Sequence, residues 1–528
     1  MKKTFLILLS VYATICFAQT NTNISNFTYW DTEPSIALNP GNSNNLVASW
    51  MRAGGIGVLA IGTSYSNNAG LTWSTSVNIA HLHSNFTSAD VSFAFSNSGT
   101  VYLSYIDHAA TADSGYVMVT KSIDGGATWG SGVKVTSALE STDIPIDRPW
   151  IAIDNSGGIY NGRLYVVSKS VSSGTMPHHI WMKFSADNGL TWSNKKLVDD
   201  SIPSNLVTNA MGVPTVGADG SLYIGYVSYN PSQSIYARAI CLKSTDGGNS
   251  FIPHIIGNSS VNSPITDTLF QGSYVLSANP SNAGNLVYTF TDQRNGDPDI
   301  LSVYSNDGGI TWSSTPARVN DDALSNSVGQ DMCWAAFSQT GKYAVTWRDR
   351  RNTGGTSSSP FEVYTTLSTD GGVTFKPNYK LSSAASPFIN IQKGNDFIGV
   401  CLDDNTIYTD WCDLRAGNTE IYSSNASMAL ITGITDNTKN DELKLKIFPN
   451  PTSSDATIEF QIKQKQYLQI NLCDMQGKII KKIASQLFTE GEHTLQINTA
   501  DLSGGSYLIR IQAGNRNIVN TTLLKIEK

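Results

Sequence analysis

The sequence predicts an all-β protein: a seven-bladed β-propeller, with six blades as the alternative, followed by a small C-terminal β-sandwich. Three observations lead to this fold class. Only 15% of the 528 residues are charged, against roughly 25% in a typical domain, while Gly (44) and Tyr (22) are plentiful, as in strands joined by tight turns. One turn motif recurs six times. The composition then changes after about residue 440.

The recurring motif is S-x-[DN]-x-G-x-[ST]-[WF], and its aromatic positions follow one another at intervals of 56 to 63 residues. Each copy lies between two β-rich runs, which predicts a hairpin turn. The acidic or amide side chain caps backbone N–H groups of the turn, and glycine supplies a positive φ. We expect a structural role for the acidic or amide position of every copy: Asn68, Asp124, Asp187, Asp246, Asp307 and Asp370.

These turns resemble the Asp-box, or BNR repeat, of the sialidase superfamily, and the likeness covers roughly residues 30–430. The resemblance implies that each box joins the third and fourth strands of a propeller blade, on the face opposite the active site. Seven strand–turn–strand units can be counted, from PSIALNP–NLVASW to NDFIGVCLDDN–TIYTDWCDLR. The segment around Asn26–Trp30 is expected to close the ring. Sialidases have six blades, so their function does not transfer directly.

The predicted domains are a signal peptide (1–18), the Asp-box propeller (19–432), a polar linker (433–443) and a C-terminal domain (444–528). This last domain resembles the C-terminal sorting domain of the type IX secretion system of Bacteroidetes. The motif positions are occupied by Lys446, Phe448, Pro449, Asn450, Pro451, Gly477 and Tyr507. The resemblance implies a partner, the type IX machinery, and a protein that is secreted or attached to the outer-membrane surface.

Charge and cysteine content narrow the possible partners. A net charge of −7 without long basic runs argues against nucleic acid and anionic membranes. The apolar run of the signal peptide is too short to span a membrane, and the sequence has no other apolar stretch of spanning length. Cys401 and Cys412 flank a short hairpin and can pair only if its register allows. No metal site and no cofactor are expected, although a structural calcium ion remains open.

An Asp-x-Arg element recurs in the last three blades, as Asp292/Arg294, Asp349/Arg351 and Asp413/Arg415. A catalytic group has one task at one place, so recurrence favours structural salt bridges. The alternative is a sialidase-like cluster in which arginines of the upper loops hold a substrate carboxylate. The predicted substrate-binding residues are Arg52, Arg148, Arg294, Arg351 and Arg415.

A second group of candidates lies in the loops of blades one to four, where five of the seven histidines fall. Histidine titrates near neutrality, tyrosine can act as an acid, and arginine can neutralise a uronate. The candidate catalytic residues are His108, His178, Tyr229 and Arg238. Further candidates in the same loops are His81, His83 and His179.

Three functions remain open for a propeller with these loops. The first is a sialidase-like glycoside hydrolase acting on an extracellular, acidic glycan. Only four Glu occur in the propeller, however, and the arginine-isoleucine-proline motif of sialidases is missing. The second is a His/Tyr-dependent polysaccharide lyase of the ulvan-lyase type, by analogy of fold. The third is a non-catalytic adhesion or protein-binding propeller.

Overall fold

The structure of the chain is a computed structural model. It describes residues 21–54, 58–109, 114–171, 178–205, 211–258, 274–355, 358–388, 397–433, 446–462, 465–473, 479–513 and 516–525. Two compact units are present, Met1–Ala426 and Ser427–Lys528. The expected signal peptide, residues 434–443 of the expected linker, and Gly477 of the sorting motif lie outside the described residues.

The first unit consists of four-stranded antiparallel sheets, and the described residues form seven of them. The first three blades contain β2 (Asp31–Leu38), β3 (Leu46–Ala53), β4 (Leu59–Ser66), β5 (Val77–Asn78), β6 (Thr87–Phe95), β7 (Val101–His108), β8 (Gly115–Ser122), β9 (Val133–Ser137), β10 (Asp147–Ile153), β11 (Leu164–Lys169), β12 (Ile180–Ser185) and β13 (Lys196–Leu197). The last four contain β14 (Val213–Val216), β15 (Leu222–Ser228), β16 (Arg238–Ser244), β17 (Ile252–Asn258), β18 (Tyr274–Ala278), β19 (Leu286–Asp292), β20 (Asp299–Ser305), β21 (Ala317–Arg318), β22 (Gln330–Phe337), β23 (Tyr343–Asp349), β24 (Glu362–Ser368), β25 (Tyr379–Lys380), β26 (Ile398–Leu402), β27 (Thr406–Asp413), β28 (Glu420–Ser427) and β1 (Thr22–Asn23). One 3-10 turn (Ala138–Glu140) and one short helix, α1 (Met428–Gly433), are also present.

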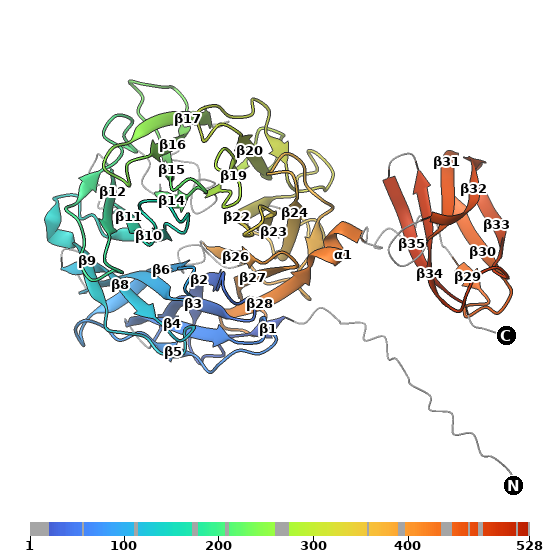
Figure 1. Ribbon diagram of the computed structural model, residues 1–528, viewed down its shortest axis with the longest axis horizontal. Helices are drawn as coiled ribbons and strands as arrows, with labels where there is room; N and C mark the ends of the chain where they lie inside the picture. The colour runs from blue at the N-terminus through green and yellow to red at the C-terminus, as the bar shows by residue number, and fades with distance from the viewer. Residues whose placement is uncertain are drawn as a thin grey trace, which may run out of the picture. The chain divides into compact units, whose positions relative to one another are not determined.

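The sheets stand in a ring around a central axis (Figure 1). The first strand of each sheet contacts the first strand of the next, in the order β2, β6, β10, β14, β18, β22 and β26, and β26 contacts β2 again. A closed ring of blades leaves only short, protected sheet edges. The predicted propeller is therefore confirmed as the fold.

Ring closure uses an earlier segment than the sequence suggested. The outermost strand of the seventh sheet is β1, in which Thr22 pairs with Ser423 and Asn23 with Tyr422. The expectation that Asn26–Trp30 closes the ring was therefore wrong by a few residues. The sheet needs only a two-residue strand here, as in several other blades, and the following residues lead to β2.

Each of the six boxes forms the turn between the third and fourth strands of its blade, as the resemblance implied. In the second box, the Ser122 hydroxyl donates to Asp124 Oδ1 (2.7 Å), and the backbone N–H groups of Gly126 and Thr128 donate to Ser122 Oγ and Asp124 Oδ1 (both 2.9 Å). The box is thus a closed local network that needs no distant residue.

Each box also accepts a hydrogen bond from the preceding blade. The acceptor is the carbonyl of its fourth residue, which has positive φ in all six copies. The donor–acceptor pairs are Asn425–Ala69 (3.5 Å), Asn45–Gly125 (2.9 Å), Lys121–Asn188 (3.1 Å), Arg163–Gly247 (2.7 Å), Lys243–Gly308 (3.0 Å) and Asn285–Gly371 (3.0 Å). The boxes therefore connect successive blades from blade seven through blade one to blade six, and within the described residues no box connects blade six to blade seven.

The second unit is a small β-sandwich. One sheet has the order β29 (Lys446–Phe448), β30 (Asp455–Ile462), β33 (Gly491–Asn498). The other has the order β32 (Ile479–Phe488), β31 (Gln466–Cys473), β34 (Gly505–Ala513), β35 (Arg516–Lys525). Their inner faces share one core, with Ile458 and Phe460 from the first sheet and Ile470 and Ile509 from the second. The predicted C-terminal sandwich is confirmed.

Candidate functional site

Strand direction divides the propeller into two ends. Because each sheet is an antiparallel meander, the Asp-box turns lie at one end, which we call the lower end. The loops between second and third strands, and the connections between blades, lie at the opposite, upper end. The candidate residues from the sequence fall in upper loops or at the ends of the strands that lead into them.

Among the described residues, four inner strands carry the same distortion near the upper end. Three of them, β2, β6 and β10, are consecutive; the fourth is β22, whose register shifts after Asp331 and whose first extra residue, Met332, also has positive φ (54°). The register of β2, β6 and β10 shifts after Thr32, Ala89 and Asp147, so two residues oppose one in each strand. The first extra residue has positive φ in each case: Glu33 (54°), Asp90 (49°) and Arg148 (48°). Such backbone is costly for residues other than glycine and is concentrated at functional sites.

Ionisable side chains gather at these bulges. We call Asp90, Asp147, Arg148, Lys169 and His178 the mouth cluster. The Arg148 backbone N–H donates to Asp90 Oδ2 (3.1 Å), and Lys169 Nζ, whose side chain is only 3% exposed, lies 2.7 Å from Asp147 Oδ2. The cluster therefore joins blades two and three.

The cluster sets two protonation states at neutral pH. Burial opposes ionisation of Asp147, but the positive charges of Lys169 and Arg148 outweigh it and lower the pKa of this carboxyl. Burial and the nearby Lys169 lower the pKa of His178. Asp147 is therefore ionised and His178 neutral, and the His178 ring nitrogens find no hydrogen-bond partner within the described part of the chain.

A stack of aromatic side chains, which we call the aromatic plug, lies across the axis below the mouth. Trp150 follows Arg148 by two residues on β10 and stacks on Trp334 of β22, with ring centroids 4.6 Å apart. Phe397 packs edge-on against Trp150 at 5.5 Å, and the Arg148 guanidinium lies 5.2 Å from the centre of the Phe397 ring. Blades three and six are not neighbours in the ring, so this stack crosses the axis.

The predicted catalytic residues separate into two groups. Asn205 forms one backbone bridge to His178 and another to Tyr229, so these two residues lie on adjacent segments. Arg238 pairs with Ser228 beside Tyr229, but its guanidinium donates to Gln233 Oε1 (2.7 Å). His108 ends β7, and its Nδ1 hydrogen-bonds the Ala109 carbonyl. The structure thus brings His178 and Tyr229 together and provides no contact that joins His108 to them.

The remaining histidine candidates each have a carboxylate or aromatic neighbour. His81 Nδ1 lies 2.9 Å from Asp107 Oδ1. His179 Nδ1 lies 3.4 Å from Asp199 Oδ1, and the nearby carboxylate raises the pKa of His179 despite burial. His83 packs edge-on against Phe86. These contacts suit loop-stabilising roles.

Four of the five predicted substrate arginines are paired with a carboxylate of their own blade. Arg52 is 3% exposed and holds Asp31 with two hydrogen bonds (2.9 and 3.0 Å). The other three pair with the aspartate two residues earlier, namely Arg294 with Asp292, Arg351 with Asp349 and Arg415 with Asp413. These contacts favour the salt-bridge alternative over one convergent cluster, and a substrate role for these four stays a prediction.

Sequence reasoning singled out Arg148 and His178 but missed Asp90, Asp147 and Lys169. One signal was available. The inner strands begin with a charged residue directly before proline in TEPSIA and DRPWIA, at Glu33–Pro34 and Arg148–Pro149. That shared pattern marks the bulge position. Asp90 lacks this pattern because valine follows it, and Lys169 can be assigned to the cluster only from its contact with Asp147 in the structure.

Two features of the described residues bear on earlier expectations. None of the five described cysteines forms a disulfide with another of them. Cys401 pairs with Tyr408, whereas Trp411, beside Cys412, pairs with Ile398, so the register keeps the two thiols apart and the suggested pairing is not formed. Among these residues there is no group of three His, Cys, Asp or Glu that could hold a metal ion, and no helix is long and apolar enough to cross a membrane.

Comparison with known proteins agrees with this architecture. Residues 446–525 match the family model of the secretion system C-terminal sorting domain, and residues 303–314 match that of the BNR/Asp-box repeat. No curated protein matches the chain. The protein is therefore an Asp-box propeller that carries a sorting domain for type IX secretion, which directs it to the cell surface or the extracellular space.

Solved structures of similar shape include several glycosidases. A Hadza microbial sialidase is 14% identical, with 75% of this chain and 76% of that chain covered and a TM-score of 0.43. An α-L-arabinanase of Penicillium chrysogenum is 11% identical (78% and 99% covered, TM-score 0.43). A Dyadobacter fermentans protein of unknown function is 13% identical (77% and 97% covered, TM-score 0.42). At these values we take no activity from the comparison.

Proposed function

We propose that the protein binds an extracellular, acidic glycan at the mouth cluster. One observation carries this proposal: three neighbouring inner strands hold the charged residues Glu33, Asp90 and Arg148 in left-handed backbone at the upper end. Asparagine or glycine would occupy these positions with less strain. The equivalent residue of β22 is the apolar Met332, so the bulge itself does not require a charge, and charged side chains at three neighbouring positions favour a function that needs them.

The chemistry of the cluster suits a sugar with a carboxylate. Arg148 and Lys169 provide cations within an otherwise acidic protein, while Asp90 and Asp147 can accept hydrogen bonds from hydroxyl groups. The aromatic plug gives the mouth a floor, so one sugar unit or chain end would be held rather than a strand passing through. Pockets at such openings are common places for ligands.

The decisive variant is Arg148→Gly. Glycine adopts the positive φ without strain, which offsets its entropic cost in the unfolded chain, so the free energy of unfolding should change by no more than about 1 kcal/mol. Binding of the secreted protein to sialosides, ulvan and other uronate polysaccharides should weaken at least about tenfold, since a charge-assisted contact is lost. Lys121→Met, which removes a cation at the lower end, is the matched control. Equal binding by wild type and Arg148→Gly would contradict the proposal.

A second candidate, the His/Tyr-dependent lyase, is favoured by the position of Asn205 between His178 and Tyr229. A neutral His178 can act as a base, and Tyr229 as its partner. Incubation with the same sialosides, ulvan and other uronate polysaccharides distinguishes a lyase, a hydrolase and a binding protein. Ultraviolet absorbance of an unsaturated product would report a lyase, and released sialic acid would report a hydrolase. Binding without either product would favour adhesion, and no binding to any glycan would exclude all three glycan functions.

A further inference from the structure

The three Asp-x-Arg elements occupy equivalent positions at the ends of β19, β23 and β27, and can be compared directly. In each, the arginine backbone N–H donates to the preceding aspartate, at 2.8 Å for Arg294 and Arg351 and 2.9 Å for Arg415. Each guanidinium also pairs with that aspartate, at 2.6 to 2.9 Å. The elements differ in what lies on the other side of the guanidinium.

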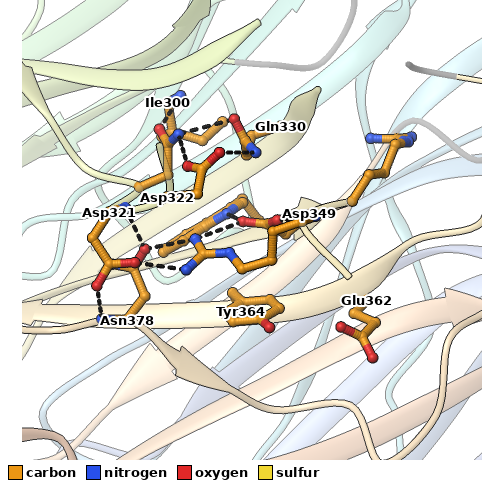
Figure 2. Close-up of polar contacts among 12 residues, drawn as sticks. Ile300, Asp321, Asp322, Gln330, Asp349, Glu362, Tyr364 and Asn378 are labelled. Atoms are coloured by element: carbon orange, nitrogen blue, oxygen red, sulfur yellow. Dashed lines mark hydrogen bonds and ion pairs between the residues drawn. The ribbon is translucent and has the colours of Figure 1, made fainter. Parts of the chain in front are cut away.

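In blades six and seven, that other side is filled by polar side chains. Arg351 donates from Nη1 to Asp321 Oδ1 (2.6 Å) and from Nη2 to Asn378 Oδ1 (2.8 Å); Asp321, Asp349 and Asn378 surround the guanidinium in Figure 2. Arg415 Nη1 likewise donates to Asn21 Oδ1 (3.1 Å) and Ser383 Oγ (3.0 Å). In both blades an asparagine directly before the outermost strand provides one of the acceptors.

In blade five the same position, directly before β21, is Pro316, which has no side-chain acceptor. A cavity of about 280 Å³ opens there between blades four and five. Arg294 lines it. Its Nη2 donates to the Asn258 carbonyl (3.2 Å), and its Nη1 has no hydrogen-bond partner within the described residues. The polar acceptors that complete the other two sites are thus replaced by open space.

The rest of the cavity wall combines apolar side chains with the polar groups of Asn258, Thr291, Asp292, Ser313 and Ser314. Its lining includes Ile256, Tyr274, Tyr288, Phe290, Val303 and Pro316. The rings of Tyr288 and Phe290 lie 5.4 Å apart, and the Arg294 guanidinium lies 5.6 Å from the centre of the Phe290 ring. Ligand pockets typically combine such walls with a few polar groups that fix orientation, and a volume near 300 Å³ is at the small end of their range.

We propose that this Arg294 cavity binds a small organic carboxylate with a flat, apolar body, such as an aryl carboxylate. The carboxylate would take the place that Asp321 holds against Arg351 in blade six, where the guanidinium accepts a second anion although Asp349 already pairs with it. The ring would lie among Tyr288, Phe290 and Val303. This cavity is separate from the mouth cluster, so the proposal stands without the proposed glycan function.

The test is calorimetric titration of the full-length protein with three probes. 3-Phenylpropionate has both the carboxylate and the apolar ring, 3-phenylpropanol lacks the charge, and glucuronate lacks the apolar body. Binding of 3-phenylpropionate at least about tenfold tighter than either analogue is expected, because the charge-assisted hydrogen bond and the buried ring both contribute. No binding of 3-phenylpropionate at millimolar concentration, or equal binding of either analogue, would overturn the proposal.

Two variants with a matched control test the location. Pro316→Asn installs the asparagine of blades six and seven, so its amide oxygen should engage Arg294 and reduce affinity for 3-phenylpropionate at least about fivefold in a folded protein. Arg294→Gln should reduce it at least about tenfold. Arg351→Gln removes the equivalent salt bridge of blade six, where Asp321 and Asn378 occupy the space beside the guanidinium, and should leave affinity for 3-phenylpropionate unchanged. Unchanged affinity in both Pro316→Asn and Arg294→Gln would refute the assignment.

Discussion

The hydrogen bonds between Asp-boxes and preceding blades predict a specific loss of stability in Asn45→Ala. Asn45 is 2% exposed, and its amide N–H₂ lies within hydrogen-bond distance of the Gly125 carbonyl (2.9 Å), Asn67 Oδ1 (3.2 Å) and the Ser66 carbonyl (3.3 Å). Two N–H groups make at most two good bonds, together about 2 kcal/mol. Leaving the Gly125 carbonyl unpaired adds about 1 kcal/mol or more. The free energy of unfolding should therefore fall by about 2–4 kcal/mol.

Urea unfolding followed by tryptophan fluorescence measures this loss, and it reports the propeller alone because all eleven tryptophans precede residue 412. Asn285→Ala should behave alike, since Asn285 makes the same contacts, including 3.0 Å to the Gly371 carbonyl. Lys121→Met breaks the corresponding bond to Asn188 from an exposed lysine and should cost no more than about 1 kcal/mol. A loss below about 1 kcal/mol for Asn45→Ala, or one equal to that of Lys121→Met, would refute the reasoning.

Three further predictions concern titratable groups. Hydrogen bonds from Thr311 lower the pKa of Asp307 to about 2, so the stabilisation that Asp307 provides is complete above about pH 4 and is lost as pH falls towards 2. Asp307→Asn should therefore flatten the dependence of the urea midpoint on pH in that window. An unchanged slope would contradict this prediction. Burial raises the pKa of Asp410 well above its usual value, so this residue destabilises the fold increasingly as pH rises above about 4. Asp410→Asn should be more stable than wild type at about pH 8 and lose that advantage near pH 4. Thermal unfolding at both pH values measures the difference. Burial raises the pKa of the Cys241 and Cys333 thiols to about 12; they should react with a disulfide reagent only in urea, and rapid labelling of the native protein would disprove their inertness.

The sequence by itself determined the Asp-boxes, the propeller and the sorting domain. Within a box, Asp124 bonds only residues two to four positions away, so the whole network is visible in eight consecutive letters. Repetition of that turn at near-constant spacing implies repetition of the blade between copies. The sorting domain is likewise visible in one contiguous segment of the sequence, from Lys446 onwards.

Only the tertiary structure decided which residues form the mouth and where a cavity opens. The Arg148 backbone reaches Asp90 across 58 residues, and Asn45 reaches Gly125 across 80. Contacts between blades depend on how the ring closes, which no local pattern encodes. Pro316 shows the same limit. In the sequence it is an ordinary turn residue. Only the folded blades show that it borders a cavity at the position where Asn378 and Asn21 provide an acceptor in blades six and seven.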